Sequence, residues 1–178
     1  IITNMKDNFK QERVNLAAAF RWAARLNMHE AVANHFSLAV SDDGSKFLLN
    51  PIGMHFSQIC ASDLLVIDSK NAETMSQPNA PDATAWAIHG AMHRNNLHAR
   101  CILHVHPKYA TILACLEDKV MKPIDQNTMR FYEKVSIDYD YDGMGVGDEA
   151  ERLCTILGDN SVLLMGNHGV LTAADSVA

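Results

Sequence analysis

The chain has 178 residues, of which 48% are apolar and 20% charged, and its formal net charge is -6. This length suits one domain that buries roughly 70% of the surface its unfolded form exposes, and the composition is that of a soluble globular protein. The acidic balance and the lack of a basic run argue against nucleic-acid and anionic-membrane partners, which require clustered lysine and arginine. No apolar stretch approaches the roughly 20 residues of a membrane span. Four widely spaced cysteines without a Cys-x-x-Cys pair indicate a reduced, cytoplasmic protein.

The first half of the chain predicts one helix followed by paired strands. From residue 10 to residue 26 apolar side chains recur at three- and four-residue spacing, which indicates an amphipathic helix. Residues 32–40 and 47–50 are separated by Ser-Asp-Asp-Gly, which is typical of a hairpin. Beyond it we expect a turn at 51–53, a short helical step at 57–61, an apolar strand at 64–68 and a surface loop at 69–82.

The second half alternates helices and strands. Asp82 or Thr84 caps a helix that runs to about residue 95, and further helices are predicted at 107–116 and 148–157. Buried strands are expected at 100–105 and 161–165, with a short strand within 129–137 and a loop at 143–147. Residues 175–178 look like the first turn of a helix whose body is missing, so we expect one domain over residues 1–178, truncated at its C-terminal helix. Hairpins mixed with strand-helix alternation predict an α/β fold, with a mixed sheet covered by helices on both faces.

The nine histidines are the unusual part of the composition, and three of them have the spacing of metal ligands. His104 and His106 lie two apart in a predicted strand, so both imidazoles point to the same face. Catalytic zinc commonly takes three protein ligands and keeps one position for water or substrate. His168 is the best third ligand, because it follows the strand at 161–165 and sits between two glycines whose backbone can approach closely. The alternative is that His104 and His106 are hydrogen-bonded core histidines.

Four motifs in order resemble the class II aldolase/adducin domain family. They are Asn34-His-Phe-Ser37, Phe47-Leu-Leu-Asn-Pro-Ile-Gly53, His104-Val-His106-Pro and Gly166-Asn-His168-Gly-Val-Leu, and the resemblance spans residues 15–178. It implies a three-layer α/β/α fold with a central, mostly antiparallel mixed sheet. In the bacterial enzymes it also implies a homotetramer with sites at subunit interfaces. By the same resemblance His104, His106 and His168 bind a divalent transition metal, with zinc preferred.

Enzymes of this family act on small hydroxy-carbonyl compounds, several of them sugar phosphates. They include fuculose-phosphate aldolase, ribulose-phosphate 4-epimerase and methylthioribulose-phosphate dehydratase. The resemblance thus implies a lyase, epimerase or dehydratase in which the cation acts as a Lewis acid and stabilises an enediolate. The positions that it places at the substrate pocket are Asn34, His35, Ser37, Asn50, Gly53 and Thr84.

The match to the aldolases fails at their catalytic glutamate. That acid/base residue stands immediately before a Trp, where this chain has Ala85 before Trp86. A methyl group cannot carry a proton, and losing a positioned acid/base typically costs about 10²–10⁴-fold in rate. Glu73 lies in the preceding loop and is expected to be solvated. The adducin branch, which is cytoskeletal and not known for catalysis, also lacks this glutamate and shares the Asn-His-x-Ser motif.

Four other polar residues, His35, Gln126, His89 and His93, have either a functional or a plain structural role. His35 follows the hairpin entry at the implied pocket, and Gln126 lies in a polar loop that lines the pocket in related enzymes; both are candidates for a catalytic group. A simple loop role is the stronger alternative for Gln126. His89 and His93 lie four apart on one face of a predicted helix. Without a glutamate beside them, structural roles are favoured for both.

Two hypotheses about function follow. The first is a zinc-dependent enzyme acting on a small hydroxy-carbonyl compound, with the acid/base role passed to water, His35 or a residue beyond the C-terminus. The second is a non-catalytic, adducin-like binding or assembly module. The intact histidine triad favours the first hypothesis, and Ala85 favours the second.

Overall fold

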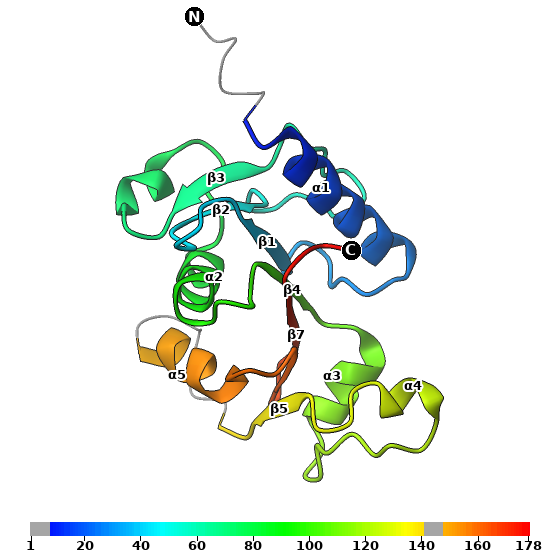
Figure 1. Cartoon of the computed structure of the whole chain (residues 1–178). Coiled ribbons are helices and arrows are strands. Elements are labelled where there is room, and N and C mark those ends of the chain that lie inside the picture. Colours follow the sequence, from blue (N-terminus) through cyan, green and yellow to red (C-terminus); the bar gives the residue numbers. More distant parts are fainter. Residues whose placement is uncertain (1–7, 141–147) are drawn as a thin grey trace, which may run out of the picture.

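The computed structural model describes residues 8–140 and 148–178 (Figure 1). The helices are α1 Lys10–Arg25, α2 Ala83–Asn95, α3 Lys108–Ala114, α4 Gln126–Met129 and α5 Asp148–Leu157, with one 3-10 helix, η1 Ala72–Ser76. The strands are β1 His35–Ala39, β2 Lys46–Leu49, β3 Leu65–Asp68, β4 Cys101–Val105, β5 Val135–Asp138, β6 Val162–Met165 and β7 Gly169–Ala174.

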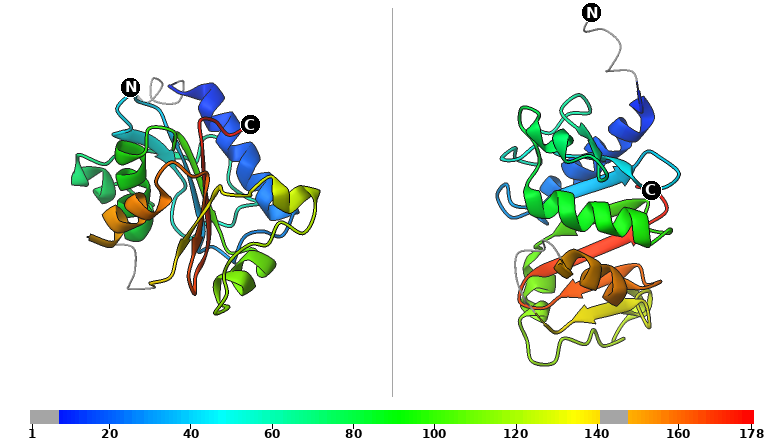
Figure 2. Two further views of the ribbon diagram at one scale, coloured as in Figure 1. Left: turned by 60° about the horizontal axis from the view of Figure 1, so that its bottom comes forward. Right: turned by 90° about the vertical axis from the view of Figure 1, so that its left-hand side faces the viewer.

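The strands form one mixed sheet in the order β3-β2-β1-β4-β7-β6-β5. Neighbouring strands are antiparallel except β5 and β6, which run parallel. Helices α2 and α5 pack together on one face, and α1, α3 and α4 lie on the other (Figure 2, left). The predicted three-layer α/β/α class, with a mostly antiparallel mixed sheet, is therefore confirmed.

Each face of the sheet has its own apolar core. On one face Phe20 of α1 stacks on Phe36 of β1, with ring centroids 4.6 Å apart, and Phe56 packs edge-on against it. On the other face α2 and α5 bury a second cluster against β4, β6 and β7, with Ile102 and Leu171 fully buried. Because β4 is packed from both sides at the centre of the sheet, the side chains at its end have fixed directions.

Most elements lie where the sequence predicted them. The hairpin is present, with Ser37 opposite Leu49 and Ala39 opposite Phe47. Asp82 caps α2, since its carboxylate accepts a hydrogen bond from the backbone N–H of Thr84 at 2.8 Å. The amphipathic helix, the two buried strands and the helix beginning at Asp148 are also confirmed.

Some local expectations are wrong. Residues 57–61 form turns rather than a helical step, because the side chains of His55 and Asp63 accept from the backbone N–H groups of Ser57 and Cys60. The loop expected at 69–82 contains η1, whereas the short strand expected within 129–137 is present as β5. Residues 175–178 form a bend and no helical turn. The loop expected at 143–147 lies outside the described residues.

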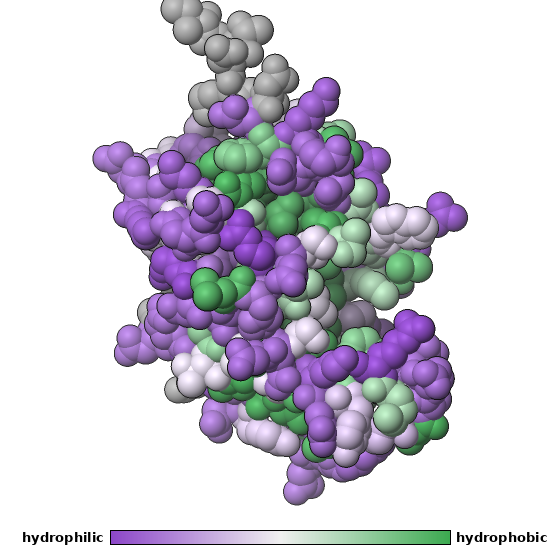
Figure 3. Space-filling view, viewed as in Figure 1, coloured by the Kyte–Doolittle hydropathy of each residue, from purple (hydrophilic) through white to green (hydrophobic). Residues whose placement is uncertain are grey.

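The surface mixes polar and apolar side chains. On the face drawn in Figure 3, apolar surface gathers along the middle, over the part of the sheet between α1 and α3. None of the described helices combines the length and the apolar character that crossing a membrane requires.

The turn between β1 and β2 touches the end of α2. Gly44 in that turn has a φ of 68°, and a Cβ placed on it would lie 1.9 Å from the backbone carbonyl oxygen of His93. Gly53 also has a positive φ, 73°, but nothing lies within 4 Å of the place where its Cβ would be. Glycine at position 44 therefore permits both the turn and the close approach of the hairpin to α2.

Substitution by alanine should lower the free energy of unfolding by different amounts at these two glycines. Gly53→Ala should lower the free energy of unfolding by about 1–2 kcal/mol, the strain of an alanine in the left-handed region. Gly44→Ala adds a backbone clash and should cost about 3 kcal/mol or more. Urea unfolding of both variants measures the difference, and equal losses would contradict the close packing of this turn on α2.

Candidate metal centre

The register of the central strands brings the site residues together. His35 of β1 pairs with His104 of β4, so both imidazoles point to the same face of the sheet, toward α2. His106 follows the end of β4, and His168 lies in the tight turn that joins β6 to β7. Since β4 pairs with both β1 and β7, the start of β1, the end of β4 and the start of β7 lie together at one end of the sheet.

His104, His106 and His168 form a compact cluster. Each offers one ring nitrogen, and these three atoms lie within 4.8 Å of one another. The three pairs of ring centroids are each 4.8 Å apart. Among the described residues this is the one group of three or more metal-ligating side chains, and it is the group that the sequence predicted.

The hydrogen bonds around the cluster test whether a cation fits. The Nδ1–H of His104 donates to the carbonyl oxygen of Val170 at 3.2 Å, and Nδ1 of His106 lies 2.5 Å from a carboxylate oxygen of Glu30. Both Nδ1 atoms therefore carry the proton, and each Nε2 holds a lone pair. The two Nε2 atoms are 3.0 Å apart. Two facing lone pairs repel unless a cation is shared between them, so this donor set fits a divalent transition metal.

Burial favours the ligand form of these rings. His104 is 2% exposed, and burial followed by the neighbouring imidazoles lowers its pKa well below the usual value. Burial, and next His106, also lower the pKa of His168. Neutral imidazole is the form that binds a metal, and the lowered pKa values of His104 and His168 favour that form.

The turn that carries His168 requires small residues on both sides. A Cβ on Gly169 would lie 2.5 Å from Cδ2 of His106, and one on Gly166 would lie 2.4 Å from the carbonyl oxygen of Asp138. Asn167 between them has a positive φ of 55°, which asparagine tolerates better than most residues. The Gly-Asn-His-Gly motif thus lets His168 approach His106 closely.

A cavity of about 390 Å³ opens beside the cluster. Of the predicted pocket residues, those that line it are Asn34, His35, Asn50, Gly53 and Thr84, together with His106, His168 and the substituted position Ala85. Val32, Ala33, Ile52 and Asp82 complete the lining. No lysine or arginine of the described residues lines it.

Other predicted site residues lie elsewhere. Ser37 is fully buried beneath the cavity, because it sits one pleat deeper than His35 on the same face of β1, and it does not line the cavity as expected. Gln126 is exposed at the start of α4 and does not line the cavity either. Glu73 is exposed in η1, as expected of a solvated loop residue.

Sequence reasoning missed two acidic residues at the site. Glu30 hydrogen-bonds His106 from 76 positions away, and no local pattern signals such a contact. Asp82 was predicted only as a helix cap, yet its carboxylate also lines the cavity, where it accepts from the Thr84 hydroxyl and backbone N–H. Burial would raise the pKa of Asp82, but these hydrogen bonds outweigh it and lower the pKa. Asp82 therefore stays ionised.

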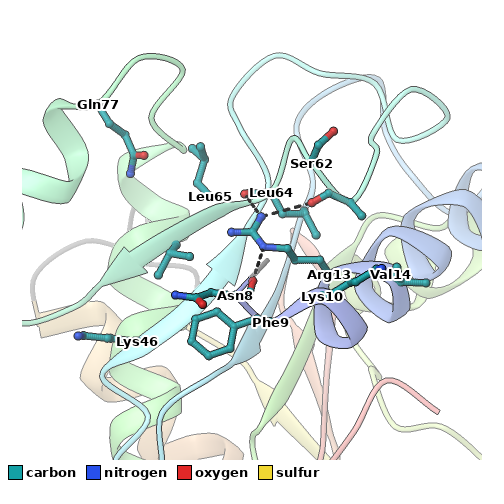
Figure 4. Close-up of a pocket in the computed structure, with 12 residues that line it drawn as sticks. Asn8, Phe9, Lys10, Arg13, Val14, Lys46, Ser62, Leu64, Leu65 and Gln77 are labelled. Carbon is teal, nitrogen blue, oxygen red and sulfur yellow. Dashed lines mark hydrogen bonds between the residues drawn. The ribbon is translucent and has the colours of Figure 1, made fainter. Parts of the chain in front are cut away.

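A second cavity, about 630 Å³, lies beside α1 and the edge strand β3 (Figure 4). Its most buried charged group is Arg13, whose guanidinium donates to the carbonyl oxygens of Asn8, Ala61 and Leu64. Those donors are therefore occupied by the backbone. We place the functional site at the histidine cluster, where titratable groups converge.

Residues 14–178 match the family described as Class II Aldolase and Adducin N-terminal domain. The chain belongs to this family. A solved aldolase II superfamily protein from Pseudomonas syringae is 31% identical with a TM-score of 0.83, over 94% of this chain and 67% of that one. L-fuculose 1-phosphate aldolase from Glaciozyma antarctica shares the fold at 22% identity and a TM-score of 0.78, over 94% and 65% of the two chains.

A curated relative from the adducin side also matches. An adducin-related protein of Schizosaccharomyces pombe is 29% identical over 173 residues, which cover 93% of this chain and 52% of the relative. The chain spans 64% and 65% of the length of two bacterial relatives. The similarity therefore covers the family's domain and only part of the length of these relatives.

The contact between Glu30 and His106 predicts a role for Glu30 in metal affinity. Glu30→Gln keeps the size of the side chain but removes the charge that holds Nδ1 of His106, so zinc affinity should fall about 10–100-fold. Competition with a chromogenic chelator measures it. Glu73→Gln, which changes an exposed acidic residue of η1, is the matched control and should bind zinc like the wild type. Equal affinity in Glu30→Gln would contradict this role.

The buried His93 predicts a pH dependence of stability. Burial lowers the pKa of His93 from 6.5 to about 4, so the unfolded chain binds a proton that the folded chain does not. This contribution to stability is complete above pH 6.5 and is lost as the pH falls toward 4. In the presence of a metal chelator, the free energy of unfolding of the wild type should therefore fall more steeply between pH 6.5 and about pH 4 than that of His93→Gln. The difference in slope should be up to about 1.4 kcal/mol per pH unit. Equal slopes in urea titrations would show that His93 is not held neutral.

Proposed function

We propose that this protein is a divalent-metal enzyme, a lyase, epimerase or dehydratase that acts on a small hydroxy-carbonyl compound. The observation that carries the proposal is the set of three converging imidazole nitrogens, two of which belong to His106 and His168 in the lining of a cavity. Three imidazoles without a thiolate suit zinc among the common metals, and three protein ligands leave a position for substrate. Bound there, zinc would supply Lewis-acid stabilisation of negative charge on substrate oxygen.

This chain's own residues prepare the site for that chemistry. Glu30 and the carbonyl of Val170 hold His106 and His104 with their Nε2 lone pairs facing each other. The Cβ-free Gly169 lets the turn with His168 close on them. A site held in place in this way loses less free energy to reorganisation when charge develops on a substrate.

Ala85 in place of the aldolase glutamate limits which side chains of the cavity can contact the substrate as an acid or base. Ala85 lines the cavity, so the aldolase acid/base group is missing from the place where it would act. Asp82 is nearby, but its hydrogen bonds keep it ionised and occupied as the cap of α2. His35 is the remaining titratable side chain of the cavity outside the metal triad, and we assign it the contact with the substrate.

The lining also bears on the substrate. Asp82 contributes a negative charge, and no lysine or arginine of the described residues lines the cavity. An anionic phosphate gains little from such a wall. We therefore favour an uncharged hydroxy-carbonyl substrate over a sugar phosphate for the part of the site that this chain builds. A homotetramer, as the family resemblance implies, would add residues of a neighbouring subunit.

An adducin-like binding or assembly module is the second candidate. The observation that favours it is again Ala85, together with the similarity to an adducin-related protein. In that case the histidine cluster would hold a structural metal, and the cavity would have no turnover to support.

Metal content and turnover separate the two candidates. Purified full-length protein should carry about one equivalent of zinc per chain, and His106→Ala should lose it while its far-UV circular dichroism persists. A panel of hydroxy-aldehydes and hydroxy-ketones, with and without phosphate, is then assayed with wild type and His106→Ala. Turnover that collapses in the variant supports the enzyme.

Two outcomes would overturn the proposal. Less than about half an equivalent of zinc, manganese or cobalt, with no gain on reconstitution, would exclude the metal centre. One equivalent of metal without turnover over the whole panel would favour the assembly module. Comparison of the oligomeric state with and without chelator would then show whether the metal supports self-association.

A further inference from the structure

His35 connects the cavity to a row of buried polar groups. Its Nδ1 lies 2.6 Å from Nε2 of His89, and Nδ1 of His89 is in hydrogen-bond contact with Oγ of Ser37. That hydroxyl lies 2.7 Å from Nε2 of His93, whose Nδ1 is 2.6 Å from the carbonyl oxygen of Ala99. The row therefore runs from β1 to α2, back to β1 and again to α2, and it ends on a backbone carbonyl just before β4.

This row has one hydrogen-bond direction, because a carbonyl oxygen can only accept. Nδ1 of His93 must donate to Ala99, which leaves Nε2 of the neutral ring as an acceptor for the Ser37 hydroxyl. Having given its only proton to His93, Ser37 must accept from Nδ1 of His89. Nε2 of His89 then accepts from Nδ1 of His35. The proton of His35 therefore lies on Nδ1, and Nε2 keeps its lone pair.

The direction depends on neutral rings, and burial supplies them. His35, His89 and His93 are 7%, 0% and 3% exposed, and no carboxylate of the described residues is hydrogen-bonded to any of them. Asp82 lines the same cavity, but it is hydrogen-bonded to Thr84 and not to these rings. A buried imidazolium without a hydrogen-bonded carboxylate is costly, so the neutral form is held.

We propose that this row is a positioning relay for the site, in which Ser37, His89 and His93 fix the tautomer of His35. Nε2 of His35 then accepts a hydrogen bond from a hydroxyl group of the bound substrate. His35 lines the cavity, and its ring lies beside that of His104 with centroids 4.8 Å apart. The relay rests on the proposed function, because a hydroxy-carbonyl substrate carries the hydroxyl that this acceptor requires.

Asn34 supplies the complementary contact. Its Oδ1 accepts from the backbone N–H of Glu30 at 2.6 Å, whereas its Nδ2 is buried without a partner among the described residues. Asn34 lines the same cavity and is 2% exposed. Asn34 and His35 thus bring an unpaired buried donor and an acceptor to the lining of one cavity, which fits a ligand that carries both a carbonyl and a hydroxyl oxygen. A carboxylate or phosphate oxygen facing His35 would meet a lone pair instead and is disfavoured.

Nitrogen NMR of the histidine rings tests the relay without an assay of activity. In the full-length protein with ¹⁵N-labelled histidine, long-range proton–nitrogen correlations distinguish protonated from unprotonated ring nitrogens, and the loss of one signal set in His35→Gln assigns that ring. We expect a protonated Nδ1 and an unprotonated Nε2 for His35, before and after chelation. A protonated Nε2 on His35 would overturn the proposal.

A pair of variants tests the role of the buried serine. Ser37→Ala removes the hydroxyl that relays the direction, so His35 should show averaged signals from both tautomers, whereas Ser37→Thr keeps the hydroxyl and should restore the wild-type pattern. Zinc affinity should stay within about twofold in both, because neither change touches a metal ligand. A fixed Nδ1-protonated His35 in folded Ser37→Ala would overturn the relay.

Another variant keeps the test decisive where Ser37→Ala does not fold. In His93→Gln the amide can present either an acceptor or a donor to Ser37, so the direction is lost and both tautomers of His35 should appear. If the wild type turns over substrate but His35 carries its proton on Nε2, the relay is contradicted and the proposed enzymatic function stands. If His35 carries its proton on Nδ1 but the protein neither binds zinc nor turns over substrate, the proposed enzymatic function is contradicted. The row of hydrogen bonds would then have only a structural role.

Discussion

The site depends on the register of β4 between β1 and β7. The pairing of His35 with His104 puts two imidazoles on the face toward α2, and the pairing of Val105 with Val170 puts the carbonyl that holds His104 beside it. A shift of one residue would turn His104 to the opposite face. Cores on both sides of the sheet resist such a shift, since it would move Ile102 out of the cluster under α2 and α5 and Cys101 out of the cluster under α1.

The imidazoles of His35, His89 and His93 are buried between the sheet and α2. Their burial costs the free energy of hydration of the ring nitrogens, which hydrogen bonds must offset. Each buried ring nitrogen left without a partner would cost about 1–3 kcal/mol. In the row from His35 to Ala99 each ring nitrogen that faces the row has a hydrogen-bond partner. Gly44 allows the hairpin to approach α2, the helix that carries His93. The geometry of the cavity wall is therefore coupled to the packing of the hairpin on α2.

The fold and the metal cluster were predictable because they rest on local patterns. The spacing of His104 and His106 and the glycines around His168 are properties of short segments. The spacing predicts that both imidazoles point to one face of a strand, and the glycines predict a backbone that can approach the site closely. The role of Glu30 was not predictable, since it depends on a contact over 76 positions made by a residue in an irregular segment. Ser37 was assigned to the pocket by its motif, but motif order cannot distinguish the pleat that lines the cavity from the one beneath it.

The buried row also bears on the choice between an enzyme and an assembly module. Four polar groups bonded end to end in a core give no more stability than apolar residues of the same volume, because each must first lose its hydration. What they add is direction: a fixed proton on one nitrogen of His35 and a free lone pair on the other. Such direction suits a ligand that approaches His35 through the cavity. Ala85 in place of the aldolase glutamate removes one proton carrier. The neighbouring wall still offers an aligned acceptor, an unpaired donor at Asn34 and the histidine triad, which together suit a small polar molecule better than the surface of another protein.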